Sequence, residues 1–169
     1  MSEGAGRLYA FGFQGVALGL TGGDQELFYC KPAADKVCQI EGVYLSNVGG
    51  SADAGDAQEE LARVEMIRLP ATVTVGSGGS SVATPSPFLV NDAAAGFTAR
   101  VNDTTLATTS GTAVPIHSDG WNTRIPYVWL PPPEHRPMVA NAQAIVLRLV
   151  TALADDITCD GTMLVRELP

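Results

Sequence analysis

Basic residues are scarce in this chain, and lysine is the scarcest of them. The 169 residues include ten Lys and Arg against 18 Asp and Glu, and the only lysines are Lys31 and Lys36. The formal net charge is −8, and the arginines occur singly, with no basic run. A surface of this sign repels a phosphate backbone, so we expect no binding of nucleic acid.

The sequence also lacks a long apolar run. No stretch reaches the roughly 18 consecutive apolar residues that a membrane helix needs. The start, Met1-Ser2-Glu3-Gly4, has neither the positive charge nor the apolar core of a secretory signal. We therefore expect a soluble protein that is made in a cytoplasm and has no membrane partner.

Cysteine and histidine are too few to predict a metal centre. Cys30, Cys38 and Cys159 form no C-x-x-C pair, which argues against a zinc knuckle and a disulfide scaffold. Cys30 and Cys38 could face each other across a hairpin, although disulfides are rare in reducing compartments. A histidine-based site would need both His117 and His135 together with carboxylates. The sequence predicts no cofactor and no metal.

Three other patterns contain the residue types of a site. His117-Ser118-Asp119 has those of a hydrolase triad, but three consecutive residues cannot point at one another, and we expect a polar turn there. The glycine-rich segment 76–81 lacks the lysine and the helix of a phosphate cradle. The acidic groups within 53–60 and 155–160 could bind Ca²⁺, but solvated turns are the simpler interpretation. The sequence predicts no catalytic residues and no enzyme.

Apolar residues and turn formers are abundant. The chain is 46% hydrophobic and only 17% charged, with 18 Gly and 11 Pro. This balance favours short strands joined by tight turns over a helical bundle. About eight apolar, β-rich segments with turn signals between them predict an all-β fold, a β-sandwich of jelly-roll type.

The predicted organisation is an extended N-terminal arm over residues 1–10 and a single β-sandwich domain over 11–169. Within the domain, the low-complexity residues 76–96 predict a long surface loop, which is often an interaction arm. Residues 56–69 have a helix capping box, but β-branched residues and Pro70 favour a short turn followed by a bent strand. The end of the chain predicts a pair of strands, over 144–153 and 162–168.

One segment is a candidate interaction surface. It combines three aromatic residues with a proline run: Trp121, Tyr127, Trp129, Pro131, Pro132 and Pro133. A rigid aromatic ledge of this kind could bind sugar rings or the surface of a partner. The alternative is that Tyr127 and Trp129 help to cover the sandwich core.

Short motifs spread along the chain resemble those of one family. They are GDAQEE at 55–60, GSGG at 76–79, TPSP at 84–87, NDTT at 102–105, HSDGWN at 117–122, WLPPPE at 129–134 and GTMLV at 161–165. Together they span most of the chain and resemble small virion structural proteins of tailed bacteriophages and prophages. The resemblance implies no catalytic residues in this chain.

The resemblance implies a capsid decoration (cement) protein on the exterior of the virion, made in the host cytoplasm. The partners that it implies are the major capsid protein and further copies of the same chain, typically as a trimer. Many copies on a symmetric shell need only modest affinity each, because avidity multiplies weak contacts. Two alternatives are a tail or head–tail connector protein and a carbohydrate-binding β-sandwich module that uses Trp121 and Trp129.

Overall fold

The computed structural model describes residues 6–18, 24–49, 61–82, 84–150, 153 and 157–169. Within these ranges one 3₁₀ turn, η2 (Pro133–His135), accompanies fourteen strands. They are β1 (Arg7–Leu18), β2 (Gln25–Pro32), β3 (Val37–Asn47), β4 (Leu61–Leu69), β5 (Val73–Thr74), β6 (Ser80–Val82), β7 (Ser86–Pro87), β8 (Phe97–Asp103), β9 (Thr108–Thr109), β10 (Val114–Asn122), β11 (Tyr127–Trp129), β12 (Met138–Ala140), β13 (Ala144–Leu149) and β14 (Ile157–Leu168). Eight of these strands have six or more residues.

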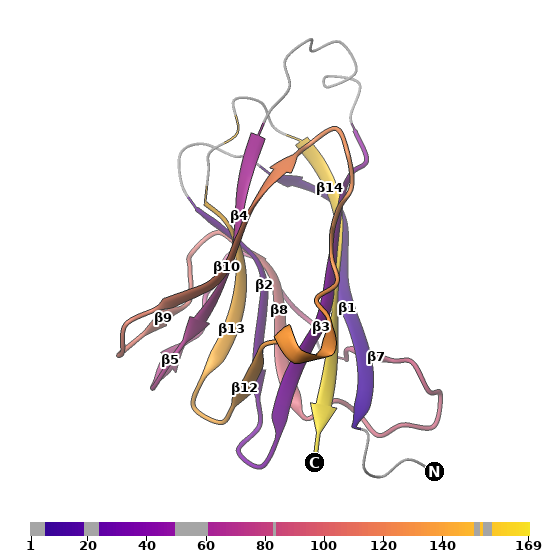
Figure 1. The fold of residues 1–169 in the computed structure, drawn as a ribbon, viewed down its shortest axis with the longest axis vertical. Coiled ribbons are helices and arrows are strands. Elements are labelled where there is room, and N and C mark those ends of the chain that lie inside the picture. Colours follow the sequence, from indigo (N-terminus) through magenta and orange to yellow (C-terminus); the bar gives the residue numbers. More distant parts are fainter. Residues whose placement is uncertain (1–5, 19–23, 50–60, 83, 151–152, 154–156) are drawn as a thin grey trace.

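Two antiparallel sheets of six strands form the two layers of a sandwich (Figure 1). Sheet A has the order β11-β3-β14-β1-β7, and β12 also pairs with β3. Sheet B has the order β10-β4-β13-β2-β8-β6. A separate two-stranded sheet consists of β5 and β9. The predicted all-β fold is confirmed, and jelly-roll topology stays a prediction.

The burial of the strands explains why these residues form sheets. Along β14 buried and partly buried residues alternate from Ile157 to Leu168, as expected of a strand with one face on the core. β13 is instead buried at every position. Its outward residues Ala144 and Val146 belong to a second apolar cluster that includes Val73 of β5 and Ala107. The small β5–β9 sheet therefore covers part of the outer face of sheet B.

Aromatic rings from β1 fill the space between the layers. Phe11 meets Phe28 of sheet B edge to face at 5.7 Å between ring centroids, and Tyr9 meets Phe97 at 5.6 Å. Such edge-to-face contacts add to the free energy gained by burying the rings. Since these residues belong to one buried cluster that joins both sheets, the core lies between sheets A and B.

The two strands predicted at the end of the chain are present as β13 and β14, but they do not pair with each other. β13 lies in sheet B between β4 and β2, whereas β14 lies in sheet A between β3 and β1. The turn predicted at 160–161 falls inside β14, and the one at 155–156 lies outside the described residues. The strand continues through Gly161 because this residue pairs with Phe13 of β1 and Leu45 of β3. Glycine fits there because an added Cβ would come within 2.5 Å of the Phe13 ring.

Gly12 marks another close approach, between β1 and β14. A Cβ at this position would lie 2.1 Å from the carbonyl oxygen of Gly161, which belongs to the backbone and cannot swing away. We expect Gly12→Ala to lower the free energy of unfolding by about 1–3 kcal/mol, as overpacking does. Urea unfolding measures this loss. Gly120→Ala, where a Cβ would meet nothing within 4 Å, is the control and should cost far less.

The predicted N-terminal arm is too long. Residues 7–10 belong to β1 and pair with β14, and Tyr9 is fully buried. Residues 1–5 of the predicted arm lie outside the described residues. The reason is that Tyr9 continues the apolar alternation of Phe11 and Phe13, which places it in the core.

The predicted loop 76–96 is partly strand. β6 pairs with β8 at the edge of sheet B, and β7 pairs with β1 in sheet A. This segment therefore connects the edges of the two sheets. The bent strand predicted near Pro70 ends there instead, because β4 stops at Leu69 and β5 begins at Val73 in another sheet. The short turn predicted from residue 56 lies outside the described residues.

The three cysteines are buried, and none of them forms a disulfide. Cys30 and Cys38 approach each other, but from β2 of sheet B and β3 of sheet A, so no hairpin places them together. A hydrogen bond with Cys38, together with burial, raises the pKa of the Cys30 thiol well above its usual range. Both side chains therefore act as apolar core residues.

Candidate functional site

The His117-Ser118-Asp119 segment lies within β10 and is not the predicted turn. It pairs with β4, with Ser118 opposite Glu65 and donating a hydrogen bond of 3.0 Å to its carboxylate. The His117 Nε2 atom lies 3.3 Å from the Tyr127 hydroxyl instead. The side chains of the three residues thus contact different groups and make no triad.

Trp121 is a core residue. Only 1% of its surface is exposed, and its indole N–H donates a hydrogen bond of 2.8 Å to the carbonyl oxygen of Ile125. Tyr127 is buried too, while Trp129 is partly buried and lies against the His117 ring at 5.2 Å between centroids. Since β10 belongs to sheet B and β11 to sheet A, these rings close the seam between the two layers.

The proline run that follows is only partly exposed. Pro131 is buried, and Pro132 and Pro133 lie at the surface before and at the start of η2. The structure therefore brings the aromatic residues of the predicted surface together, but mostly inside the protein. Because Trp121 and Tyr127 are buried, the interpretation that the aromatic residues contribute to packing fits their positions better than a ledge does.

The raised pKa values of two buried tyrosines lead us to expect that the free energy of unfolding decreases at alkaline pH. Burial raises the pKa of Tyr29 and of Tyr127 to about 12, and the nearby charges of Glu26 and Asp119 respectively act in the same direction. The unfolded chain releases these protons near pH 10. Stability should therefore be retained below about pH 10 and fall as the pH rises towards 12.

Urea unfolding between pH 8 and 11, with an absorbance titration of the phenols, tests this expectation. Tyr127→Phe should lessen the alkaline loss of stability. Ionisation of all four tyrosines together near pH 10 in the folded protein would contradict it.

Sequence reasoning missed a buried ion pair between Glu26 of β2 and Arg148 of β13. The Arg148 Nε and Nη2 atoms lie 3.1 and 3.0 Å from Glu26 Oε2. Ala107, in the segment before β9, completes the group: its N–H donates to Glu26 and its carbonyl accepts from Arg148. No sequence signal links residues that are 122 positions apart.

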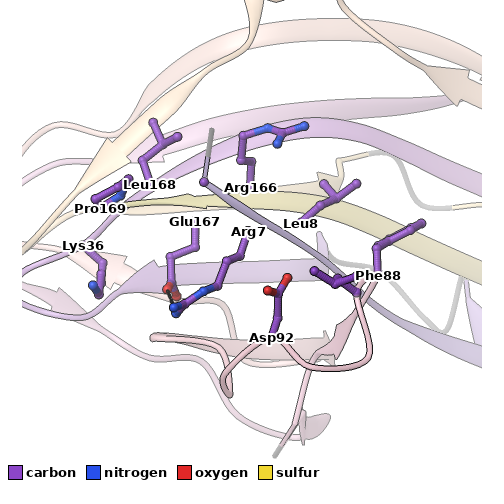
Figure 2. A pocket seen from close by; sticks show the side chains of 11 residues that line it. Arg7, Leu8, Lys36, Phe88, Asp92, Arg166, Glu167, Leu168 and Pro169 are labelled. Carbon is purple, nitrogen blue, oxygen red and sulfur yellow. Dashed lines mark ion pairs between the residues drawn. The ribbon is translucent and has the colours of Figure 1, made fainter. Parts of the chain in front are cut away.

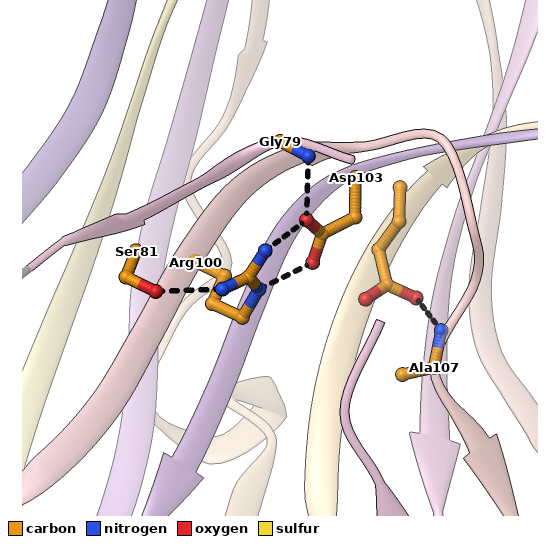
Figure 3. A network of polar contacts seen from close by, with 6 residues as sticks. Gly79, Ser81, Arg100, Asp103 and Ala107 are labelled. Carbon is orange, nitrogen blue, oxygen red and sulfur yellow. Dashed lines mark hydrogen bonds and ion pairs between the residues drawn. The ribbon is translucent and has the colours of Figure 1, made fainter. Parts of the chain in front are cut away.

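A second polar group ties the 76–82 segment to β8, as Figure 3 shows. The Arg100 guanidinium binds both carboxylate oxygens of Asp103 at 2.6 and 2.7 Å, and it also reaches the Ser81 hydroxyl. Asp103 accepts the N–H of Gly79 at 3.0 Å. These charges are satisfied by one another, which suits a structural role.

Two features are absent from the described residues: clustered metal ligands and long apolar helices. No three His, Cys, Asp or Glu among them are grouped as metal ligands would be. No helix in this part of the chain is long and apolar enough to cross a membrane. The acidic residues of segment 53–60 lie outside the described residues.

A pocket of about 630 Å³ lies beside the start of β1 and the end of β14 (Figure 2). Its charged lining residues are Arg7, Lys36, Asp92, Arg166 and Glu167. Phe88 and Leu89, from the loop between β7 and β8, form part of its wall. With Val90 they form an apolar loop, Phe88–Val90, in which the three residues are 60%, 63% and 90% exposed.

The sequence contained a signal for this loop, namely three consecutive apolar residues inside a polar, proline-rich stretch. The low-complexity composition of 76–96 predicts one surface loop and does not distinguish these three residues from their neighbours. Comparison with protein-family models, curated proteins and solved structures finds no match.

Proposed function

We propose that this chain is a non-enzymatic capsid decoration (cement) protein of a tailed bacteriophage, which stabilises the head through contacts between protein subunits. The observation that carries the proposal is the exposed apolar loop Phe88–Val90 on an otherwise well-packed β-sandwich. Contiguous exposed apolar side chains are costly in water, so they commonly mark a surface that another protein covers. The motif resemblance supplies the class of partner, the major capsid protein.

The arrangement of charge supports a structural role. Buried acidic side chains are held by arginines: Glu26 by Arg148, and Glu41 by both Arg136 and Arg166. A carboxylate held in this way is poorly placed to serve as a general base or a nucleophile. The Glu26–Arg148 pair joins β2 to β13, and the Glu41–Arg166 pair joins β3 to β14, so each links neighbouring strands of one sheet.

The fold also suits attachment to a shell. Each sheet contains long strands, and in sheet A β1 and β14 pair over ten residue positions. A rigid module of this kind loses little conformational entropy when it binds, so a small contact can still contribute to affinity. A trimer on the shell, as the resemblance implies, would add avidity.

The aromatic residues at the β10–β11 seam are poorly placed to bind carbohydrate. Sugar rings stack on exposed aromatic faces, and Trp121 is buried between the sheets. A tail or head–tail connector role would use the same apolar loop, so copy number is the quantity that separates it from decoration.

Quantitative mass spectrometry of density-purified phage particles tests the proposal. The ratio to measure is copies of this chain per copy of the major capsid protein. A ratio near one supports decoration of the whole shell. A few copies per particle would assign the chain to the tail or neck, and its absence from particles would overturn any virion role.

A further inference from the structure

Strand β10 has one edge that pairs with no other strand among the described residues. It pairs with β4 on one side over eight positions, and it is the last strand in the order of sheet B. Three residues in its second half, Ser118, Asp119 and Gly120, are exposed. The edge of a sheet presents N–H and C=O groups to which a further strand can be added.

Two hydrogen bonds show which backbone groups of β10 face this edge. The Arg63 carbonyl accepts the Val150 N–H at 2.9 Å and so points away from β10, and Arg63 is the residue opposite Gly120. Because backbone groups alternate in direction along an antiparallel strand, those of Ser118 and Gly120 point to the open edge. The Gly120 N–H donates to the Asp119 carboxylate at 2.8 Å, which agrees with this direction. This part of β10 can therefore form a second antiparallel ladder.

We infer that β10 is the surface through which two copies of this chain associate, as an antiparallel pair of β10 strands centred on Ser118. A two-fold axis at Ser118 lets its N–H and C=O groups bond to those of its counterpart, and the two B sheets become one continuous sheet. The contact forms in the free protein and does not depend on the proposed function. It leaves the loop Phe88–Val90 accessible, because β7, which precedes that loop, lies at the opposite end of sheet A from β11.

The side chains of β10 favour a second copy in this register. Each His117 comes to lie directly opposite Asp119 of the other copy, where side chains on neighbouring strands approach most closely. Since His117 Nε2 lies 3.3 Å from the Tyr127 hydroxyl, Nδ1 is the atom that donates to the carboxylate. An axis at Asp119 would instead place two carboxylates opposite each other. Because each copy carries −8, association requires complementary charges of this kind at the contact.

The same register brings apolar side chains together at both ends of the paired strands. Val114, at the start of β10, is 46% exposed, and Ile125, in the turn between β10 and β11, is 60% exposed. Antiparallel pairing centred on Ser118 places position 114 of one copy opposite position 122 of the other. Val114 therefore approaches the turn that contains Ile125, twice in each dimer. Covering these side chains adds affinity to the hydrogen bonds of the ladder.

Sedimentation velocity of the purified chain over a range of concentrations, in about 0.15 M salt, tests the inference. The wild-type chain should form a dimer. Asp119→Lys should raise the dissociation constant of the dimer by about tenfold, because a lysine then faces each His117 in place of a carboxylate. Asp24→Lys is the matched control, since Asp24 is exposed and precedes β2, which β4 and β13 separate from β10. It should dimerise like wild type, and melting temperatures should show both variants folded.

A cross-link tests the register. In Ser118→Cys the two introduced thiols lie across the two-fold axis, where paired Cα atoms are about 5.5 Å apart and a disulfide can form. Oxidised glutathione, which is reduced as the thiols are oxidised, should therefore link two copies. Gly120→Cys is the control, because its thiols would be about 13 Å apart along the strands and should link far less. The native cysteines are buried and do not compete.

Three results would contradict the inference. A wild-type chain that stays monomeric at the highest concentrations measured would overturn it and leave the proposed function standing. A dimer that Asp119→Lys does not weaken would show that copies associate through another surface. Equal linking of Ser118→Cys and Gly120→Cys would overturn the pairing centred on Ser118.

Discussion

Removing one member of the Glu26–Arg148 pair should lower the free energy of unfolding by about 3–5 kcal/mol. Glu26→Leu leaves the Arg148 guanidinium buried with the Ala107 carbonyl as its remaining described partner, and Arg148→Met leaves the Glu26 carboxylate uncompensated. Urea unfolding of each variant measures the loss. Lys36→Met is the control, because the Asp35 carboxylate that it pairs with is exposed and a pair of this kind should be worth less than about 1 kcal/mol.

The double variant Glu26→Leu/Arg148→Met should recover most of that loss. Burial raises the pKa of Glu26 despite the opposing charge of Arg148, so bringing its ionised form into the protein has a net cost. The contribution of Glu26 is accordingly greatest at acid pH and declines as the pH rises from about 4.5 through the raised pKa. A double variant as unstable as the two single losses added together would contradict this account.

Trp121→Ala should likewise cost about 3–5 kcal/mol, the usual loss for removing a large buried aromatic side chain. The substitution empties the core beside the β10–β11 seam and removes the hydrogen bond to Ile125. The measurement is again urea unfolding. Trp129→Ala is the matched control, and its loss should be smaller because Trp129 is only partly buried.

The same pair of variants discriminates between packing and carbohydrate binding. If Trp121 packs the core, Trp121→Ala changes stability by much more than Trp129→Ala. A Trp121→Ala protein of wild-type stability that had lost affinity for glycans would favour the carbohydrate-binding alternative.

The strands themselves were largely predictable, because their burial follows local patterns. β14 alternates between buried and partly buried residues, and β13 is apolar except for Arg148. β13 lies within the predicted segment 144–153, and β14 includes the predicted segment 162–168. Turn-forming residues did not form a turn where they could pair with a neighbouring strand over many positions. The polar 117–120 segment was predicted as a turn, yet it continues β10 because β4 supplies a partner over eight positions.

The assignment of strands to sheets was not predictable from neighbours in sequence. β2 and β3 are joined by a short loop, and β13 and β14 are close in sequence, but each pair is divided between sheets A and B. These pairings depend on contacts between distant segments, such as β1 with β14. The Glu26–Arg148 pair escaped prediction for the same reason.

What the sequence by itself determined is the class of fold and the sign of the charge. Composition, periodicity and turn formers act locally, so they suffice to specify an all-β chain with a net charge of −8. The tertiary structure alone decided which apolar residues are covered. It placed Trp121 inside and left Phe88–Val90 outside, because exposure depends on which distant strands pack over a residue and not on the residue's own hydrophobicity.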